Sequence, residues 1–122
     1  MSEKPPVLIV DDEVHIRRLL YFILKKMGFE KIHRAKNGEE GISFFKEYHP
    51  QITLMDINMP IMDGLQALEK IMALSPEAKV IMLTSLASRE VVEKCAALGA
   101  SDFIRKDTPQ EEIAQSIKEL LE

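Results

Sequence analysis

Side chains that could perform chemistry follow several short apolar runs, at the points where buried strands would end. They are Asp11, Asp12 and Glu13 after the first run, Asp56 after the third, Thr84 after the fourth and Lys106 shortly after the fifth. If these runs are neighbouring parallel strands, their carboxyl ends meet at one edge of the sheet, where ligands bind in open α/β sheets. The sequence therefore predicts one site, with carboxylates on both walls and a hydroxyl and an ammonium on the far side.

The predicted cluster of carboxylates requires a cation. Two carboxylates about 4 Å apart repel by roughly 4 kcal/mol at an effective dielectric constant of about 20. Because the strand ends carry no Cys or His, the ligands are hard oxygens, which favours Mg²⁺ over softer metals and also fits Mn²⁺. Lys106 and Thr84 would then bind the anionic oxygens of a phosphate. The chemistry indicated is phosphoryl transfer onto a carboxylate.

The elements that must position these residues follow from an alternation of apolar runs and helix-period segments. Five runs read as strands: Val7–Val10, the weaker Lys31–Ala35, Ile52–Met55, Val80–Leu83 and the short Phe103–Ile104. The first, third and fourth are almost wholly apolar, as expected for central strands covered on both faces, and the other two suit edges. The predicted fold is α/β, with a five-stranded parallel sheet in the order 2-1-3-4-5 between two layers of helices.

The helical segments carry end signals. The first places apolar residues at helical spacing from Ile16 to Met27 and is followed by Gly28, which suits a left-handed C-cap. The fourth is closed in the same way by Gly99. In the last, Thr108 is predicted to be the capping residue and Pro109 the first helical residue.

Composition limits the classes of function. A chain of 122 residues suits one domain, and a formal charge of −4 without a basic cluster argues against nucleic-acid binding. The single cysteine, Cys95, excludes an internal disulfide framework and a Cys-rich zinc site. We find no signal peptide and no apolar run long enough for membrane insertion, so we expect a soluble cytoplasmic domain.

Each of these residues also has a purely structural explanation. The three consecutive acids suit the N-terminus of a helix, whose dipole favours negative charge. Asp56 could form a turn, Thr84 could be an ordinary loop hydroxyl, and Lys106 could be a solvated surface residue. Only their joint placement at the strand ends favours a site.

That joint set resembles a bacterial response regulator receiver domain over the whole chain. The likeness rests on the Asp11-Asp12 pair, the segment from Asp56 to Gly64 (DINMPIMDG), Thr84 and Lys106, and is strongest to single-domain receivers of the chemotaxis type. It implies a flavodoxin-like, doubly wound sheet and one receiver domain over residues 1–122. It also implies a signalling domain of a two-component system, which takes part in its own phosphorylation and slow autodephosphorylation, rather than an enzyme.

The resemblance assigns roles at the acidic end. Asp56 would accept a phosphoryl group from a phosphohistidine of a sensor histidine kinase or phosphotransfer protein. Asp12, Asp56 and the backbone carbonyl of Asn58 would bind Mg²⁺ directly, and Asp11 would act through a bound water.

It assigns further roles on the other side of the site. Thr84 would donate a hydrogen bond to the phosphoryl oxygens, and Lys106 would pair with them. Phe103 takes the place of the family's switch aromatic, although it also suits an ordinary core aromatic of an edge strand. Phosphorylation would then repack the face made by the fourth helix, fifth strand and fifth helix, where a downstream protein target would dock.

Other functions fit the sequence less well. It has neither a G-x-G-x-x-G motif nor a P-loop, and a calcium loop starting at Asp56 would place Ile61 where glycine is needed. An aspartyl phosphatase would carry a second Asp where Asn58 stands. The serious alternative is a receiver fold that docks a partner without phosphorylation, and the complete set of acids, Thr84 and Lys106 argues against it.

One feature departs from the family pattern. The family has proline, with a cis bond, directly after the lysine, whereas Lys106 is followed by Asp107. Because a cis bond before a residue other than proline costs about 2.5 to 4 kcal/mol, we predict that the Lys106–Asp107 bond is trans. Asp107 is also a candidate competitor for the Lys106 ammonium.

Overall fold

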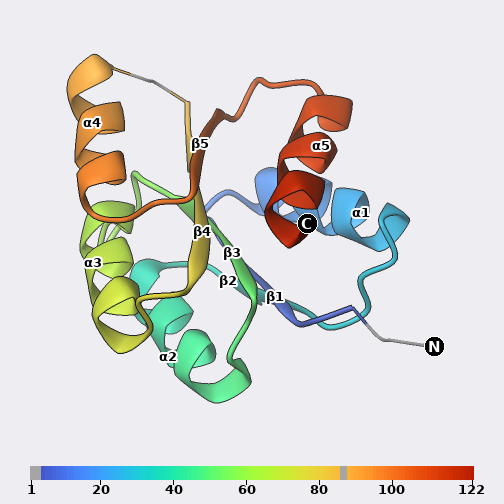
Figure 1. The fold of residues 1–122 in the computed structure, drawn as a ribbon, viewed down its shortest axis with the longest axis horizontal. Coiled ribbons are helices and arrows are strands. Elements are labelled where there is room, and N and C mark those ends of the chain that lie inside the picture. The colour runs from blue at the N-terminus through green and yellow to red at the C-terminus, as the bar shows by residue number, and fades with distance from the viewer. Residues whose placement is uncertain (1–3, 86–87) are drawn as a thin grey trace.

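The sheet has five parallel strands in the order β2-β1-β3-β4-β5, in a computed structural model that describes residues 4–85 and 88–122 (Figure 1). The strands are β1 (Val7–Val10), β2 (Ile32–Ala35), β3 (Ile52–Asp56), β4 (Lys79–Thr84) and β5 (Asp102–Arg105). The predicted strand order is confirmed. Strands β3, β4 and β5 run slightly further than the apolar runs, so Asp56 and Thr84 are the last residues of their strands.

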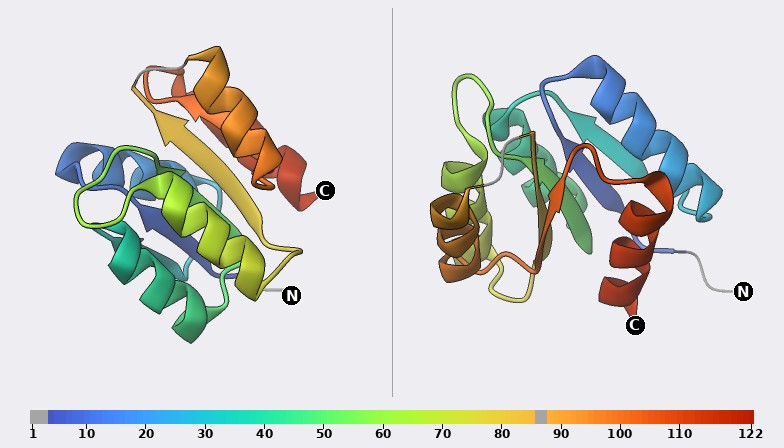
Figure 2. Two further views of the ribbon diagram at one scale, coloured as in Figure 1. Left: turned by 90° about the vertical axis from the view of Figure 1, so that its left-hand side faces the viewer. Right: turned by 90° about the horizontal axis from the view of Figure 1, so that it is seen from above.

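Helices cover both faces of the sheet. They are α1 (Val14–Lys26), α2 (Gly38–Tyr48), α3 (Gly64–Leu74), α4 (Arg89–Ala97) and α5 (Gln110–Leu121). The two views of Figure 2 place α1 and α5 on one face, and α2, α3 and α4 on the other. Within residues 4–85 and 88–122, no helix is long and apolar enough to cross a membrane.

The hydrophobic core has two parts because successive side chains of a strand point to opposite faces. Val7 and Ile9 of β1 belong to the cluster under α1 and α5, whereas Leu8 and Val10 belong to the cluster under α2, α3 and α4. Every residue of β1 and β3 is buried, whereas the edge strands β2 and β5 are only partly buried. The three-layer α/β fold predicted from the alternation of strands and helices is confirmed, and so is the doubly wound sheet that the resemblance implies.

The helix ends match the predictions at two places and differ at a third. Gly28 and Gly99 have φ values of 96° and 101°, as expected of left-handed residues after α1 and α4. The predicted start of the last helix is wrong: α5 begins at Gln110, and Pro109 (φ −57°, ψ 148°) is its N-cap. Because ψ of Pro109 is extended, Thr108 lies outside the helix and is not its capping residue. The carbonyl of Pro109 accepts the first hydrogen bonds of the helix, from the N–H groups of Glu112 and Ile113.

Candidate functional site: an acidic cluster around a lysine

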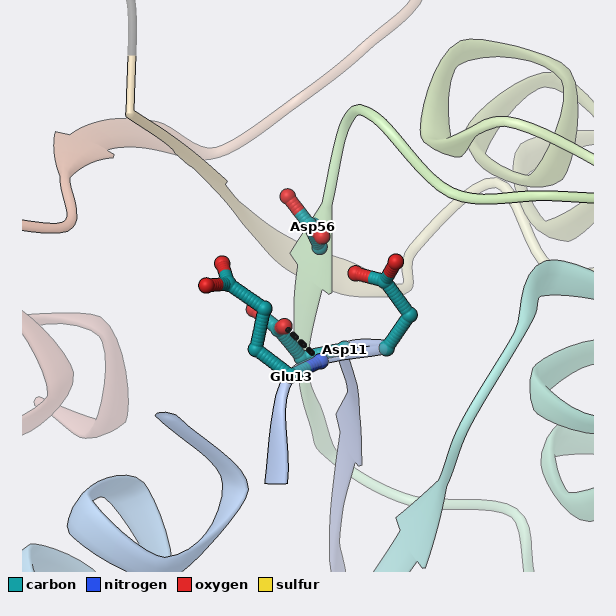
Figure 3. A group of neighbouring side chains, drawn as sticks. Asp11, Glu13 and Asp56 are labelled. Atoms are coloured by element: carbon teal, nitrogen blue, oxygen red, sulfur yellow. Dashed lines mark hydrogen bonds between the residues drawn. The ribbon is translucent and has the colours of Figure 1, made fainter. Parts of the chain in front are cut away.

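Four acidic side chains meet at the carboxyl ends of β1 and β3. Asp11, Asp12 and Glu13 follow β1, Asp56 ends β3, and each offers a carboxylate oxygen within 4.8 Å of the others. Figure 3 shows the carboxylate of Asp56 at the tip of its strand, beside those of Asp11 and Glu13. Asp11 and Asp56 are buried, whereas Asp12 is exposed. The predicted convergence of the acids from β1 and β3 is therefore present.

Hydrogen bonds that involve both backbone and side-chain atoms fix the acidic loop. The N–H of Asp11 donates to the carbonyl of Ala35 in β2 at 3.1 Å, and Arg17 of α1 donates to the carbonyl of Asp11 at 2.6 Å. Asp11 Oδ1 accepts from the N–H of Glu13 at 2.8 Å, the bond drawn in Figure 3. Glu13 is the N-cap residue of α1, but its side chain makes no capping hydrogen bond. Its carboxylate is directed elsewhere.

The ammonium of Lys106 lies among three of these carboxylates. Lys106 Nζ is 2.6 Å from Glu13 Oε1, 2.9 Å from Asp11 Oδ2 and 3.2 Å from Asp56 Oδ1. The lysine side chain is only 8% exposed. Its backbone N–H donates to the carbonyl of Thr84 at 2.8 Å, which fixes the start of the β5–α5 loop against the end of β4. The structure thus brings Lys106 to the acids, as the sequence predicts.

The pKa values of the cluster respond to burial and to the lysine. Burial and the charge of Asp11 raise the pKa of Asp56 to about 7, although Lys106 opposes this shift. Burial likewise raises the pKa of Asp11, and the hydrogen bond from Lys106 lowers the pKa of Glu13. Burial disfavours the charged form of Lys106, but its bonds to Glu13 and Asp11 and the nearby negative charges raise its pKa overall. These contacts therefore favour the charged form of the lysine.

The donor set fits a small divalent cation. The four acidic residues supply hard oxygen ligands, which Mg²⁺ prefers. Lys106 contributes one positive charge against four carboxyl groups, so the cluster retains negative charge for a metal ion when those groups are ionised. These residues therefore form a group that could hold a metal, and Mg²⁺ matches their chemistry.

A glycine allows the loop after Asp56 to close tightly. The N–H of Gly64 donates to the carbonyl of Ile57 at 2.7 Å, and a Cβ atom on Gly64 would lie 2.0 Å from the carbonyl oxygen of Asp56. Only glycine permits this approach. Within the loop, Asn58 is exposed and Ile61 adopts φ 72° with 75% of its surface exposed. The loop that carries Asn58 is thereby anchored beside Asp56.

Thr84 and Phe103 occupy neighbouring strands. Thr84 is buried at the end of β4, one residue beyond Leu83, the cross-strand partner of Asp56. Phe103 is half-buried, pairs with Met82 across β4 and β5, and packs against the cluster under α2, α3 and α4. Thr84 thus ends a strand beside that of Asp56, whereas Phe103 lies within β5.

The loop after Lys106 confirms one prediction and corrects another. No peptide bond among residues 4–85 and 88–122 is cis, so the Lys106–Asp107 bond is trans as predicted. The expectation that Asp107 competes for Lys106 is wrong. Both carboxylate oxygens of Asp107 accept hydrogen bonds from the Arg105 guanidinium, each at 3.1 Å, so Asp107 pairs with Arg105 rather than with Lys106.

Glu13 is the residue whose contact the sequence reasoning missed. Its position beside Asp11 and Asp12 places it in the acidic loop, but does not identify its partner. The 2.6 Å contact with Lys106 joins residues 93 positions apart and depends on the direction of both side chains. The only signal in the sequence is a third acid directly after the acidic pair.

Comparison with known proteins yields one family. The model of the response regulator receiver domain matches residues 7–118. The chemotaxis protein CheY of Bacillus subtilis is 36% identical over 115 residues, which cover 94% of this chain and 96% of that protein. CheY of Listeria monocytogenes is 38% identical over 112 residues, which cover 92% and 94%.

A solved structure agrees with these relatives. The complex of CheX, CheY, BeF3 and Mg²⁺ from Borrelia burgdorferi contains a chain with a TM-score of 0.94 and 34% identity, covering 98% of this chain and 91% of that one. The fold, the family model and these relatives indicate a signalling domain rather than a classical enzyme. This chain therefore belongs to the response regulator receiver domains of two-component systems and is similar to CheY.

Proposed function

We propose that Asp56 accepts a phosphoryl group from a phosphohistidine of a sensor histidine kinase or phosphotransfer protein, with Mg²⁺ as cofactor. The observation that carries the proposal is the position of the buried Asp56 carboxylate at a strand end, 3.2 Å from the Lys106 ammonium and within the acidic cluster. In the transfer, the P–N bond of the phosphohistidine breaks, a P–O bond to Asp56 forms, and the imidazole leaves with the electron pair.

The acidic cluster supports a metal role in this reaction. Asp12, Asp56 and the backbone carbonyl of Asn58 would hold Mg²⁺, with Asp11 acting through a bound water. When bound, the ion would supply positive charge that neutralises the oxygens of the transferred group. Lys106 would pair with those oxygens, and the raised pKa of its ammonium suits that role.

Thr84 and Phe103 would connect the site to a partner surface. Thr84 would donate a hydrogen bond to the phosphoryl oxygens, and Phe103 would turn inward from its half-buried position. The population would then shift toward a conformation in which α4, β5 and α5 bind a downstream protein target. Val92 of α4 is an exposed apolar residue.

The test is phosphorylation by acetyl phosphate with Mg²⁺, followed by measurement of the intact mass. We expect the chain to gain one phosphoryl group and the Asp56→Asn variant to gain none. Asp63→Asn is the matched control, because Asp63 lies in the same loop as the N-cap of α3 and asparagine caps helices equally well. A chain that gains no phosphoryl mass would support the phosphorylation-independent docking module instead.

A further inference from the structure

Three carboxylates share the Lys106 ammonium, and the proposed function employs only two of them. An ammonium has three N–H donors, and Glu13, Asp11 and Asp56 lie within 3.2 Å of the nitrogen. In the proposed reaction, Asp56 receives the phosphoryl group and Asp11 turns toward the metal. Glu13 has no part in that reaction, although it makes the shortest of the three contacts, at 2.6 Å.

Glu13 is built to keep this contact. Its backbone N–H donates to Asp11 Oδ1, so the residue is tied to the acidic loop independently of its side chain. Its second carboxylate oxygen, Oε2, lies 3.6 Å from His15 Nε2. Because its side chain is 41% exposed whereas the Lys106 side chain is 8% exposed, Glu13 holds the ammonium from the solvent side of the site.

We propose that Glu13 is a positioning residue that holds Lys106 at the mouth of the site throughout phosphoryl transfer. The proposal rests on the proposed function. One N–H of the ammonium stays with Glu13, and the other two are available to the oxygens of the incoming phosphoryl group. Without Glu13, only Asp11 and Asp56 hold the ammonium, so it moves further toward the acceptor carboxylate and opposes metal binding more strongly.

A double-mutant cycle tests whether Glu13 acts through Lys106. Glu13→Gln, Lys106→Met and the double variant are incubated with acetyl phosphate and saturating Mg²⁺, and the rate of phosphorylation is followed by intact mass. We expect Glu13→Gln to slow phosphorylation roughly tenfold relative to the unsubstituted chain, which is about the effect of one charge-assisted hydrogen bond. In the Lys106→Met background, adding Glu13→Gln should slow phosphorylation by less than about twofold relative to Lys106→Met alone. Glu30→Gln removes the same charge at the other end of the sheet, before β2, and should leave the rate unchanged.

A second variant separates contact from charge. Glu13→Asp keeps the negative charge but is one methylene shorter, so we expect it to slow phosphorylation as Glu13→Gln does. An unchanged or faster rate for Glu13→Gln, a wild-type rate for Glu13→Asp, or equal losses in both Lys106 backgrounds would each overturn the proposal. These results differ from failure of the proposed function, in which the unsubstituted chain gains no phosphoryl group at all.

Discussion

Replacing Asp56 with asparagine should stabilise the metal-free protein, and increasingly so as the pH rises. The pKa of Asp56 is raised to about 7 because the carboxyl group is buried beside Asp11. A carboxyl group with a higher pKa in the folded than in the unfolded state binds its proton more tightly when folded. Its ionisation therefore lowers the free energy of unfolding as the pH rises from about 4 to about 7. Asparagine is neutral at every pH and escapes this cost.

The size of the effect follows from the shift. A pKa raised from 3.8 to about 7 is roughly 3 units, and at about 1.36 kcal/mol per unit the ionised carboxylate costs about 4 kcal/mol above pH 8. At pH 5 the same shift gives only about 2 kcal/mol, because the folded form is still protonated. These figures are upper bounds, since water entry and relaxation reduce the cost of burying a charge.

Urea unfolding with a chelator present, from pH 4 to pH 9, measures this difference. The Asp56→Asn variant should be little more stable than the unsubstituted protein at pH 4, and its advantage should level off above pH 7. Adding Mg²⁺ should reduce the advantage, because binding to the folded acidic site stabilises the unsubstituted protein. A difference that is independent of pH, or larger at pH 4 than at pH 8, would refute the reasoning.

Three further changes have expected outcomes. Ile61→Gly should stabilise the protein by about 1 kcal/mol, because φ of Ile61 is 72° and its side chain is mostly exposed, and a thermal melt with no upward shift would contradict this. Gly64→Ala should destabilise it by about 3 kcal/mol in urea unfolding, since the new methyl group would clash with the carbonyl of Asp56; an unchanged midpoint would exclude the clash. Asp12→Ala should weaken Mg²⁺ binding in calorimetric titration more than Asp11→Ala, and equal curves would remove the distinction between direct and water-mediated ligands.

The division into central and edge strands and the acidic site were predictable because both depend on patterns that burial imposes, whereas the strand order also drew on the family resemblance. Central parallel strands are covered on both faces, so Val7–Val10 and Ile52–Met55 are continuously apolar. A polar residue at the carboxyl end of such a run must lie where the parallel strands end together. This reasoning brought Asp56 and Lys106 together from positions 50 residues apart in the chain.

The two wrong predictions, the capping residue of α5 and the partner of Asp107, each required a choice between residues that are close in the sequence. The sequence pattern does not make that choice. Thr108 and Pro109 both suit the start of a helix, and the extended ψ of Pro109 decides between them. Arg105 and Lys106 both lie within two residues of Asp107, but successive side chains of an extended chain point to opposite sides. Arg105 is therefore available on the exposed side to bind Asp107, whereas Lys106 reaches inward to Asp11 and Asp56.

The arrangement of the strands also affects when the site can form during synthesis. Asp11 and Asp56 are made early, but the ammonium that balances them belongs to Lys106, after the last strand. A nascent chain that ends before this lysine holds two buried acids without their cation, which disfavours docking of β1 against β3. We expect closure of the sheet to be coupled to completion of β5, so that a ribosome-bound fragment without that strand lacks the complete acidic site.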